Sequence, residues 1–123
     1  MGISIIDGKK YYIGSNEKLT LSSQVNEEKN LPMVFGKFSV NDFLNLQKML
    51  KNENIDLNKI SKYFSYKSKR WDLTDNNGLI LMLPYDDVQA SLKIYNDLVQ
   101  NNITSSAKIV DLRIPKNLIL TYE

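Results

Sequence analysis

The chain has 123 residues, a formal net charge of +2, 42% hydrophobic residues and 24% charged residues. This length suits one domain with its own core, the composition excludes wholesale disorder, and the charge is too small to imply a nucleic-acid binder by itself. Cysteine and histidine are absent, which excludes disulfides, thiolate chemistry, imidazole bases and the usual zinc sites.

The first segment predicts a β-hairpin. The β-prone runs 3–6 and 11–13 flank the turn sequence at 7–10, which begins with Asp-Gly. Residues 14–31 are polar and predict irregular structure, and residues 31–36 predict a short buried connector. Because the chain enters a strand almost at once, we expect it to be a fragment of something longer.

The first helix is expected to start after Ser39, whose hydroxyl can accept from an orphan N–H, with Asp42 three residues on in a capping-box-like pattern. The helix is expected to end near Asn52. Its predicted inner face comprises Val40, Phe43, Leu44 and Leu50.

Three strands are expected next. Residues 57–66 fit either a helix or a strand, and we favour a strand from about Ile60. Residues 71–74 alternate as a half-buried strand does, and 79–83 form an apolar return strand. Between them, Asn77-Gly78 predicts a type I′ turn.

The second helix is expected to start near Asp86-Asp87, because carboxylates favour a helix N-terminus. It is expected to end at residues 101–102, before a loop at 104–106 and two final strands within 107–122, bent at Pro115. The predicted buried stripe is Val88, Leu92, Tyr95 and Val99.

Strand pairs separated by helices indicate an α+β fold with a mostly antiparallel sheet and two main helices, in one domain spanning 1–123. The last strand, at 118–122, ends next to the chain terminus and is expected at a sheet edge. Such an edge can accept a strand from another protein. Trp71 is expected in the core.

Two other functions stay open at this point. One hypothesis is an enzyme in which two acidic residues act as an acid/base pair. Helix capping, turns and solvated loops explain most of these residues without catalysis. They are Glu27, Glu28, Asp75, Asp86, Asp87 and Asp111. A basic-aromatic cluster at 66–71 instead suggests a small nucleic-acid-binding module. No metal or cofactor is expected.

Several motifs together carry a family resemblance. Arg70-Trp71-Asp72-Leu73-Thr74, the Asn-Gly hairpin and the strand at 79–83 resemble a strand pair of the bacterial cell-division protein family FtsQ, or DivIB in other lineages. The second helix and then Val110-Asp111-Leu112-Arg113 are similar to the next elements in order, and 6–8 and 32–36 are similar to earlier ones.

The resemblance implies the β domain of a single-pass inner-membrane protein, lying in the periplasm. The membrane helix and a POTRA domain would precede this chain. The resemblance also implies a non-catalytic divisome scaffold that binds the periplasmic parts of FtsB-like and FtsL-like partners and no nucleic acid. In that family the last strand receives a partner strand, and a cation beside the Trp strand meets a partner carboxylate.

Carried over to this chain, the receiving strand is 114–122, and the cation is Lys69 or Arg70. The partner-binding residues expected from the resemblance are Lys69, Arg70, Ile114, Lys116, Leu118, Leu120 and Tyr122. Pro115 and Ile114 depart from the family pattern, because proline removes a ladder donor and isoleucine lacks a polar tip.

Overall fold

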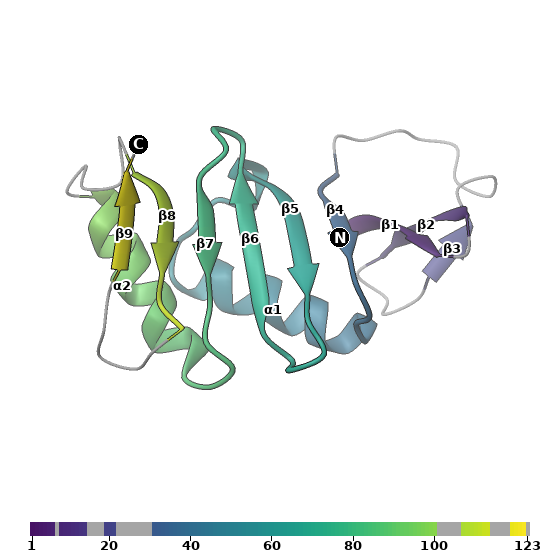
Figure 1. The fold of residues 1–123 in the computed structure, drawn as a ribbon. Helices are drawn as coiled ribbons and strands as arrows, with labels where there is room; N and C mark the ends of the chain where they lie inside the picture. The colour runs from purple at the N-terminus through teal and green to yellow at the C-terminus, as the bar shows by residue number, and fades with distance from the viewer. Residues whose placement is uncertain (7, 15–18, 22–30, 101–106, 114–118, 123) are drawn as a thin grey trace.

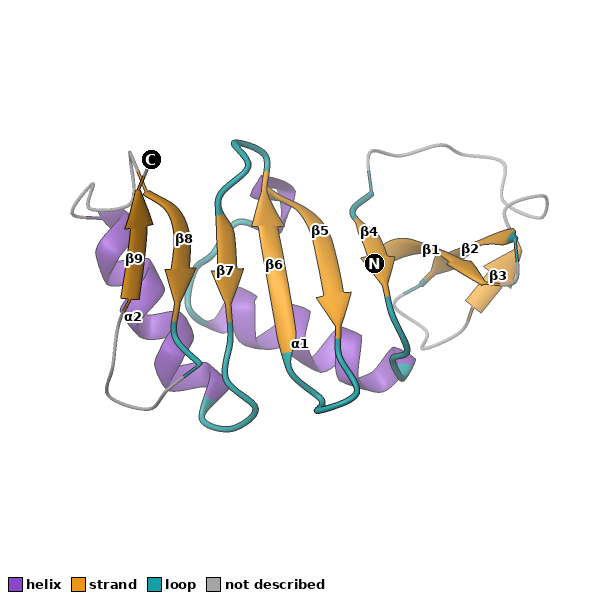
Figure 2. Ribbon diagram, in the orientation of Figure 1, coloured by secondary structure: helices purple, strands orange, loops and turns teal. Residues whose placement is uncertain are grey.

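One nine-stranded sheet organises the chain, with two helices on one of its faces (Figures 1 and 2). The computed structural model describes residues 1–6, 8–14, 19–21, 31–100, 107–113 and 119–122. The strand order is β3-β2-β1-β4-β5-β6-β7-β8-β9. Five of the neighbouring pairs are antiparallel and three are parallel. The structure therefore confirms the α+β class, the mostly antiparallel sheet and the terminal strand at the sheet edge.

The elements in chain order are β1 (Gly2–Ile6), β2 (Lys9–Ile13), β3 (Leu19–Leu21), β4 (Met33–Phe35), α1 (Val40–Asn52), a 3₁₀ turn (Leu57–Lys59), β5 (Ile60–Ser65), β6 (Trp71–Asp75), β7 (Ile80–Met82), α2 (Val88–Gln100), β8 (Ala107–Asp111) and β9 (Ile119–Tyr122).

The first hairpin forms as expected. β1 and β2 pair antiparallel with Ile6 opposite Lys9, and Gly8 has a φ of 77°, which glycine adopts without strain. β3, within the segment expected to be irregular, pairs with β2. Figure 1 shows these three strands at the far end of the sheet from β9, turned relative to the central strands.

The expected connector at 31–36 contains a strand, β4, which lies between β1 and β5 and runs parallel to both. The connector prediction was therefore wrong for these residues. Three residues are too few to show strand periodicity, so pairing on both sides makes the strand. Parallel neighbours need a crossover connection, and α1 supplies it between β4 and β5, as α2 does between β7 and β8.

The start and end of α1 confirm the sequence prediction. Ser39 is extended, and its Oγ accepts a hydrogen bond from the backbone N of Asp42 at 3.0 Å. The helix ends at Asn52. Phe43 and Leu50 are buried as expected, and Leu46 is buried with them.

The loop between β6 and β7 differs from the predicted type I′ turn. Gly78 has a φ of 87°, but neither Asn76 nor Asn77 has a positive φ. Gly78 N donates to Asp75 O at 3.1 Å, and Asp75 Oδ1 accepts from Asn77 N at 2.8 Å and Leu79 N at 2.9 Å. The Asp75 carboxylate thus accepts from two backbone N–H groups of the loop, and Gly78 is its one residue with a positive φ.

Helix α2 starts directly after Asp87, as expected, and buries Leu92. The prediction for Val99 was wrong, because Val99 is exposed and Leu98 is buried instead. Both positions continue a helical stripe from Tyr95, at spacings of three and four. Packing of the helix on the sheet decides between them. The expected helix end at 101–102 and the loop at 104–106 lie outside the described residues.

An aromatic group forms the centre of the core beneath the helices. The ring centres of Phe43 and Tyr63 are 5.0 Å apart, edge to face, and Trp71 lies 6.2 Å from Phe43. Trp71 is only 7% exposed, which confirms its expected place in the core. None of the helices in the described part of the chain is long and apolar enough to cross a membrane.

Candidate functional site

Strand β9 forms one margin of the sheet. It pairs antiparallel with β8, with Asp111 opposite Ile119 and Val110 opposite Leu120. Within the described residues no strand pairs with its other side. A peptide backbone on that side can therefore continue the ladder.

The side chains of β9 divide between core and solvent. Leu120 is partly buried and packs against the core, so the chain's own residues already cover part of it. Ile119 is 49% exposed and Tyr122 is 50% exposed. Of the residues expected to bind a partner, Tyr122 is thus available at the edge, while Ile114, Lys116 and Leu118 lie outside the described residues.

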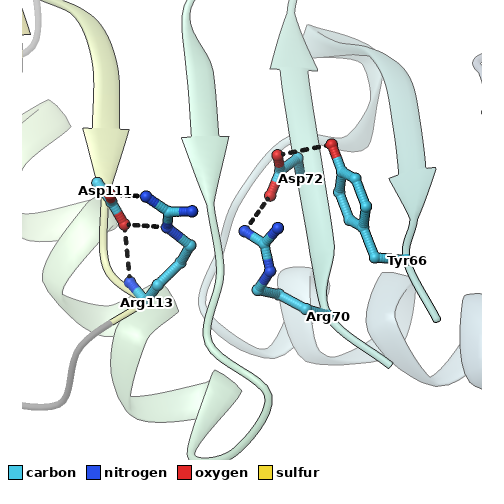
Figure 3. A network of polar contacts seen from close by, with 5 residues as sticks. All are labelled: Tyr66, Arg70, Asp72, Asp111 and Arg113. Carbon is cyan, nitrogen blue, oxygen red and sulfur yellow. Dashed lines mark hydrogen bonds and ion pairs between the residues drawn. The ribbon is translucent and has the colours of Figure 1, made fainter. Parts of the chain in front are cut away.

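The sheet face opposite the helices, called the open face below, carries a polar cluster (Figure 3). The cluster consists of Tyr66, Arg70, Asp72, Asp111 and Arg113. Arg70 Nη1 lies 3.1 Å from Asp72 Oδ1, and Tyr66 donates its hydroxyl to Asp72 Oδ2 at 3.1 Å. The guanidinium carbon of Arg70 lies 4.6 Å from the centre of the Tyr66 ring, in cation–π contact. Three side chains from the β5–β6 hairpin therefore fix one another.

A second ion pair lies at the end of β8. Arg113 donates from Nε to Asp111 Oδ1 at 2.9 Å and from Nη2 to Asp111 Oδ2 at 2.6 Å. The backbone N of Arg113 also donates to Asp111 Oδ1, at 3.0 Å. This fork-to-carboxylate geometry is the strong, directional form of an ion pair.

Two groups of the cluster show shifted pKa values with clear causes. The hydrogen bonds from Arg113 hold the pKa of the Asp111 carboxyl below its usual range, against a smaller opposing effect of burial. Burial raises the pKa of the Tyr66 hydroxyl, and its hydrogen bond to Asp72 adds to that shift. Asp111 is thus held in its charged form and Tyr66 in its neutral form.

The structure separates the two cations that the sequence treated as alternatives. Arg70 lies within the polar cluster, whereas Lys69 lies in the hairpin turn with a φ of 63°. Lys69 lines a cavity of about 730 Å³ together with residues of α1 such as Leu46. Arg70, unlike Lys69, is therefore the cation that shares the open sheet face with Arg113.

The same cavity bears on the enzyme hypothesis, because Asp42 and Asp86 both line it. Both residues are exposed, and Asp86 Oδ1 accepts from Asp87 N at 2.9 Å. General acid catalysis by a carboxyl pair requires one member to be desolvated. This pair therefore does not carry an acid/base mechanism.

The nucleic-acid hypothesis loses its stacking platform. Trp71 is buried under α1, and Arg70 is paired with Asp72 and stacked on Tyr66. Base stacking needs an exposed aromatic face beside an available cation. The cluster at 66–71 offers Tyr66 alone for that purpose.

Sequence reasoning missed the part played by Arg113, Asp111 and Asp72. A signal for them exists in the spacing: Arg70 and Asp72 are two residues apart, and so are Asp111 and Arg113. Residues two apart in an extended segment point to the same side. Opposite charges at that spacing therefore predict an ion pair on one sheet face.

Comparison with models of known protein families found a match. The family model for the cell division protein FtsQ/DivIB, C-terminal, matches residues 7–113 of the chain. A search of curated proteins found no match.

Proposed function

The chain belongs to the FtsQ/DivIB family of cell-division proteins through the family's C-terminal domain, and from this premise we propose that it is a non-catalytic scaffold domain that binds its partners by strand addition at β9. The partners are the periplasmic parts of FtsB-like and FtsL-like division proteins. The domain is held at the inner membrane by an upstream anchor and lies in the periplasm.

The observation that carries this proposal is the position of β9 at the sheet margin, with Tyr122 and Ile119 about half exposed. A guest strand gains backbone hydrogen bonds along the edge, which set its register, and its alternate side chains meet those of β9. Covering the exposed half of Tyr122 or Ile119 contributes roughly 1 kcal/mol each.

The polar cluster supports the same partner chemistry. Arg113 follows β8, the neighbour of β9, and its side chain is 44% exposed. If the partner segment continues from β9 across the open face, Arg113 is the first cation that an acidic residue of that segment can contact. Arg70, one strand beyond β7, is the next cation on that face. Such pairs fix the orientation of the bound segment and add modestly to affinity.

The test is a calorimetric titration of the 123-residue chain with a synthetic peptide from the membrane-distal part of the FtsB-like partner of the same cell. We expect Tyr122→Ala and Ile119→Lys each to weaken binding about fivefold or more, which corresponds to about 1 kcal/mol. Tyr85→Ala is the matched control, because Tyr85 is an exposed tyrosine on the loop before α2, in a cavity that no described residue of β9 lines. It should bind the peptide as the wild type does.

Hydrogen exchange separates strand addition from any other contact. Backbone amides of 119–122 should exchange more slowly when the peptide is bound, since the new ladder protects them. Absence of binding by the wild type, or equal binding by all four proteins with unchanged exchange at β9, would contradict the proposal.

A further inference from the structure

The two ion pairs of the open face are related by the sheet register. Asp72 lies opposite Met82, and Met82 lies opposite Asp111, so both carboxylates project from the same face on either side of β7. Two strand spacings separate β6 from β8, which places their backbones about 10 Å apart. Figure 3 shows Arg70 and Arg113 extending over this face beside β7.

Within each pair, the carboxylate is the inner member and the guanidinium the outer one. The Asp72 side chain is 8% exposed and that of Arg70 is 20% exposed, and the corresponding values for Asp111 and Arg113 are 12% and 44%. In each pair the aspartate is therefore the more buried member and the arginine the more exposed one. A ligand that approaches this face meets arginine before aspartate.

The pairing leaves the arginines able to bind a second acceptor. A guanidinium has five N–H groups. Asp111 accepts from two of those of Arg113, and Asp72 accepts from one of those of Arg70. The remaining donors share the plane that the aspartate has fixed, and Tyr66 fixes the plane of Arg70 further by lying under it.

We propose that Asp72 and Asp111 are positioning residues, which hold Arg70 and Arg113 as preformed receptors for carboxylates of the partner segment. This inference rests on the proposed function and specifies how its site works. A free arginine loses the freedom of several rotatable bonds when it binds, and an arginine already fixed by its aspartate loses less. The four charges also sum to zero, so the cluster acts at contact distance and exerts little long-range attraction on an acidic ligand.

The aspartates could instead compete with the ligand for the arginines, and that role predicts the opposite change in affinity. If Asp111 merely competes with the ligand for Arg113, its removal frees a cation and tightens the binding of an acidic peptide. If Asp111 positions Arg113, its removal weakens binding even though the protein becomes more positive. The sign of the change therefore distinguishes the two roles.

The experiment uses the same synthetic peptide with wild type, Asp111→Asn, Arg113→Ala and the double variant. We expect Asp111→Asn to weaken binding about fivefold, and the double variant to bind no more weakly than Arg113→Ala alone, because the aspartate acts only through the arginine. Asp72→Asn with Arg70→Ala repeats the cycle at the other pair. Asp86→Asn is the matched control, since it removes the same charge from an exposed aspartate in the loop before α2.

A second readout needs no partner. In an NMR spectrum of the chain alone, the Nε–H signal of Arg113 should exchange slowly with water in the wild type and faster in Asp111→Asn. Thermal melts of each variant confirm that it is folded. A fast-exchanging Arg113 signal in the wild type overturns the positioning role.

The failures are distinguishable. If the wild type does not bind the peptide, the proposed function falls and the positioning role falls with it. If the wild type binds, but Asp111→Asn binds equally well or more tightly, the positioning role alone is overturned and strand addition stands.

Discussion

The two faces of strands β4 to β8 differ in charge and in their cover by helices, although neighbouring residues of the same strands supply them. On the helix-covered face, paired positions across the sheet form a buried apolar row: Val34, Tyr63, Leu73, Leu81 and Val110. One residue along each strand, the open face carries Phe35, Phe64, Asp72, Met82 and Asp111. Side chains alternate between faces along a strand, so one register determines both rows.

The comparison shows that the buried apolar row and the charged cluster lie on different faces. Burial of apolar side chains under α1 and α2 is the main stabilising term on the covered face. Ion pairs at a surface add little to the free energy of unfolding, whatever they do for a ligand. Substitutions on the two faces should therefore affect different measurements.

The largest effect is expected from Phe43→Ala. Phe43 is fully buried and contacts Tyr63 and Trp71, so its truncation leaves a cavity and should lower the free energy of unfolding by about 3–5 kcal/mol. Phe35→Ala is the control on the open face, where Phe35 stacks on Phe64 at 4.9 Å but is partly exposed. It should cost about 1 kcal/mol. Urea denaturation measures both, and equal losses would contradict the division between faces.

A smaller effect is expected at alkaline pH. Burial raises the pKa of Tyr63 to about 12, and its hydroxyl has no partner among the described residues, although Gln47 opposes the shift slightly. The unfolded pKa is about 10, so the folded protein binds the proton more tightly and stability falls as the pH rises from 10 to 12. The total loss is roughly 3 kcal/mol.

Tyr63→Phe removes this titration, so its free energy of unfolding should fall less over the same pH range. Tyr66→Phe is the comparison on the open face, where the pKa of Tyr66 is also raised but its side chain is exposed, so this variant should flatten the profile less than Tyr63→Phe does. A Tyr63→Phe profile as steep as the wild type's would show that the phenol is not the responsible group.

The smallest effect is expected at acid pH. The hydrogen bonds from Arg113 lower the folded pKa of Asp111, so the stabilisation is present above the unfolded pKa of about 3.9 and is lost as the pH falls through the folded value. Asp111→Asn should flatten only this lowest part of the stability profile. Asp86→Asn is the control, and a flattening as large as that of Asp111→Asn would assign the effect to general charge loss.

Local signals in the sequence were sufficient for elements whose cause is local. Ser39 caps α1 through its own hydroxyl, and Gly8 lies in the turn between β1 and β2. The order of strands and helices was enough to indicate the α+β class and the edge position of the last strand. These features depend on residues close in the chain, where side-chain chemistry and periodicity act directly.

Features that depend on residues far apart in the chain could be determined only from the tertiary structure. β4 is a strand because β1 and β5 pair with it on both sides, and Leu98 is buried in place of Val99 because α2 packs on the sheet with that rotation. The ion pairs of Arg70 and Arg113 lie close together on one face because β7 pairs with both β6 and β8, in a register that sets Met82 opposite both Asp72 and Asp111. Sequence spacing cannot encode such neighbours, since the sheet order, set by packing of the whole core, brings them together.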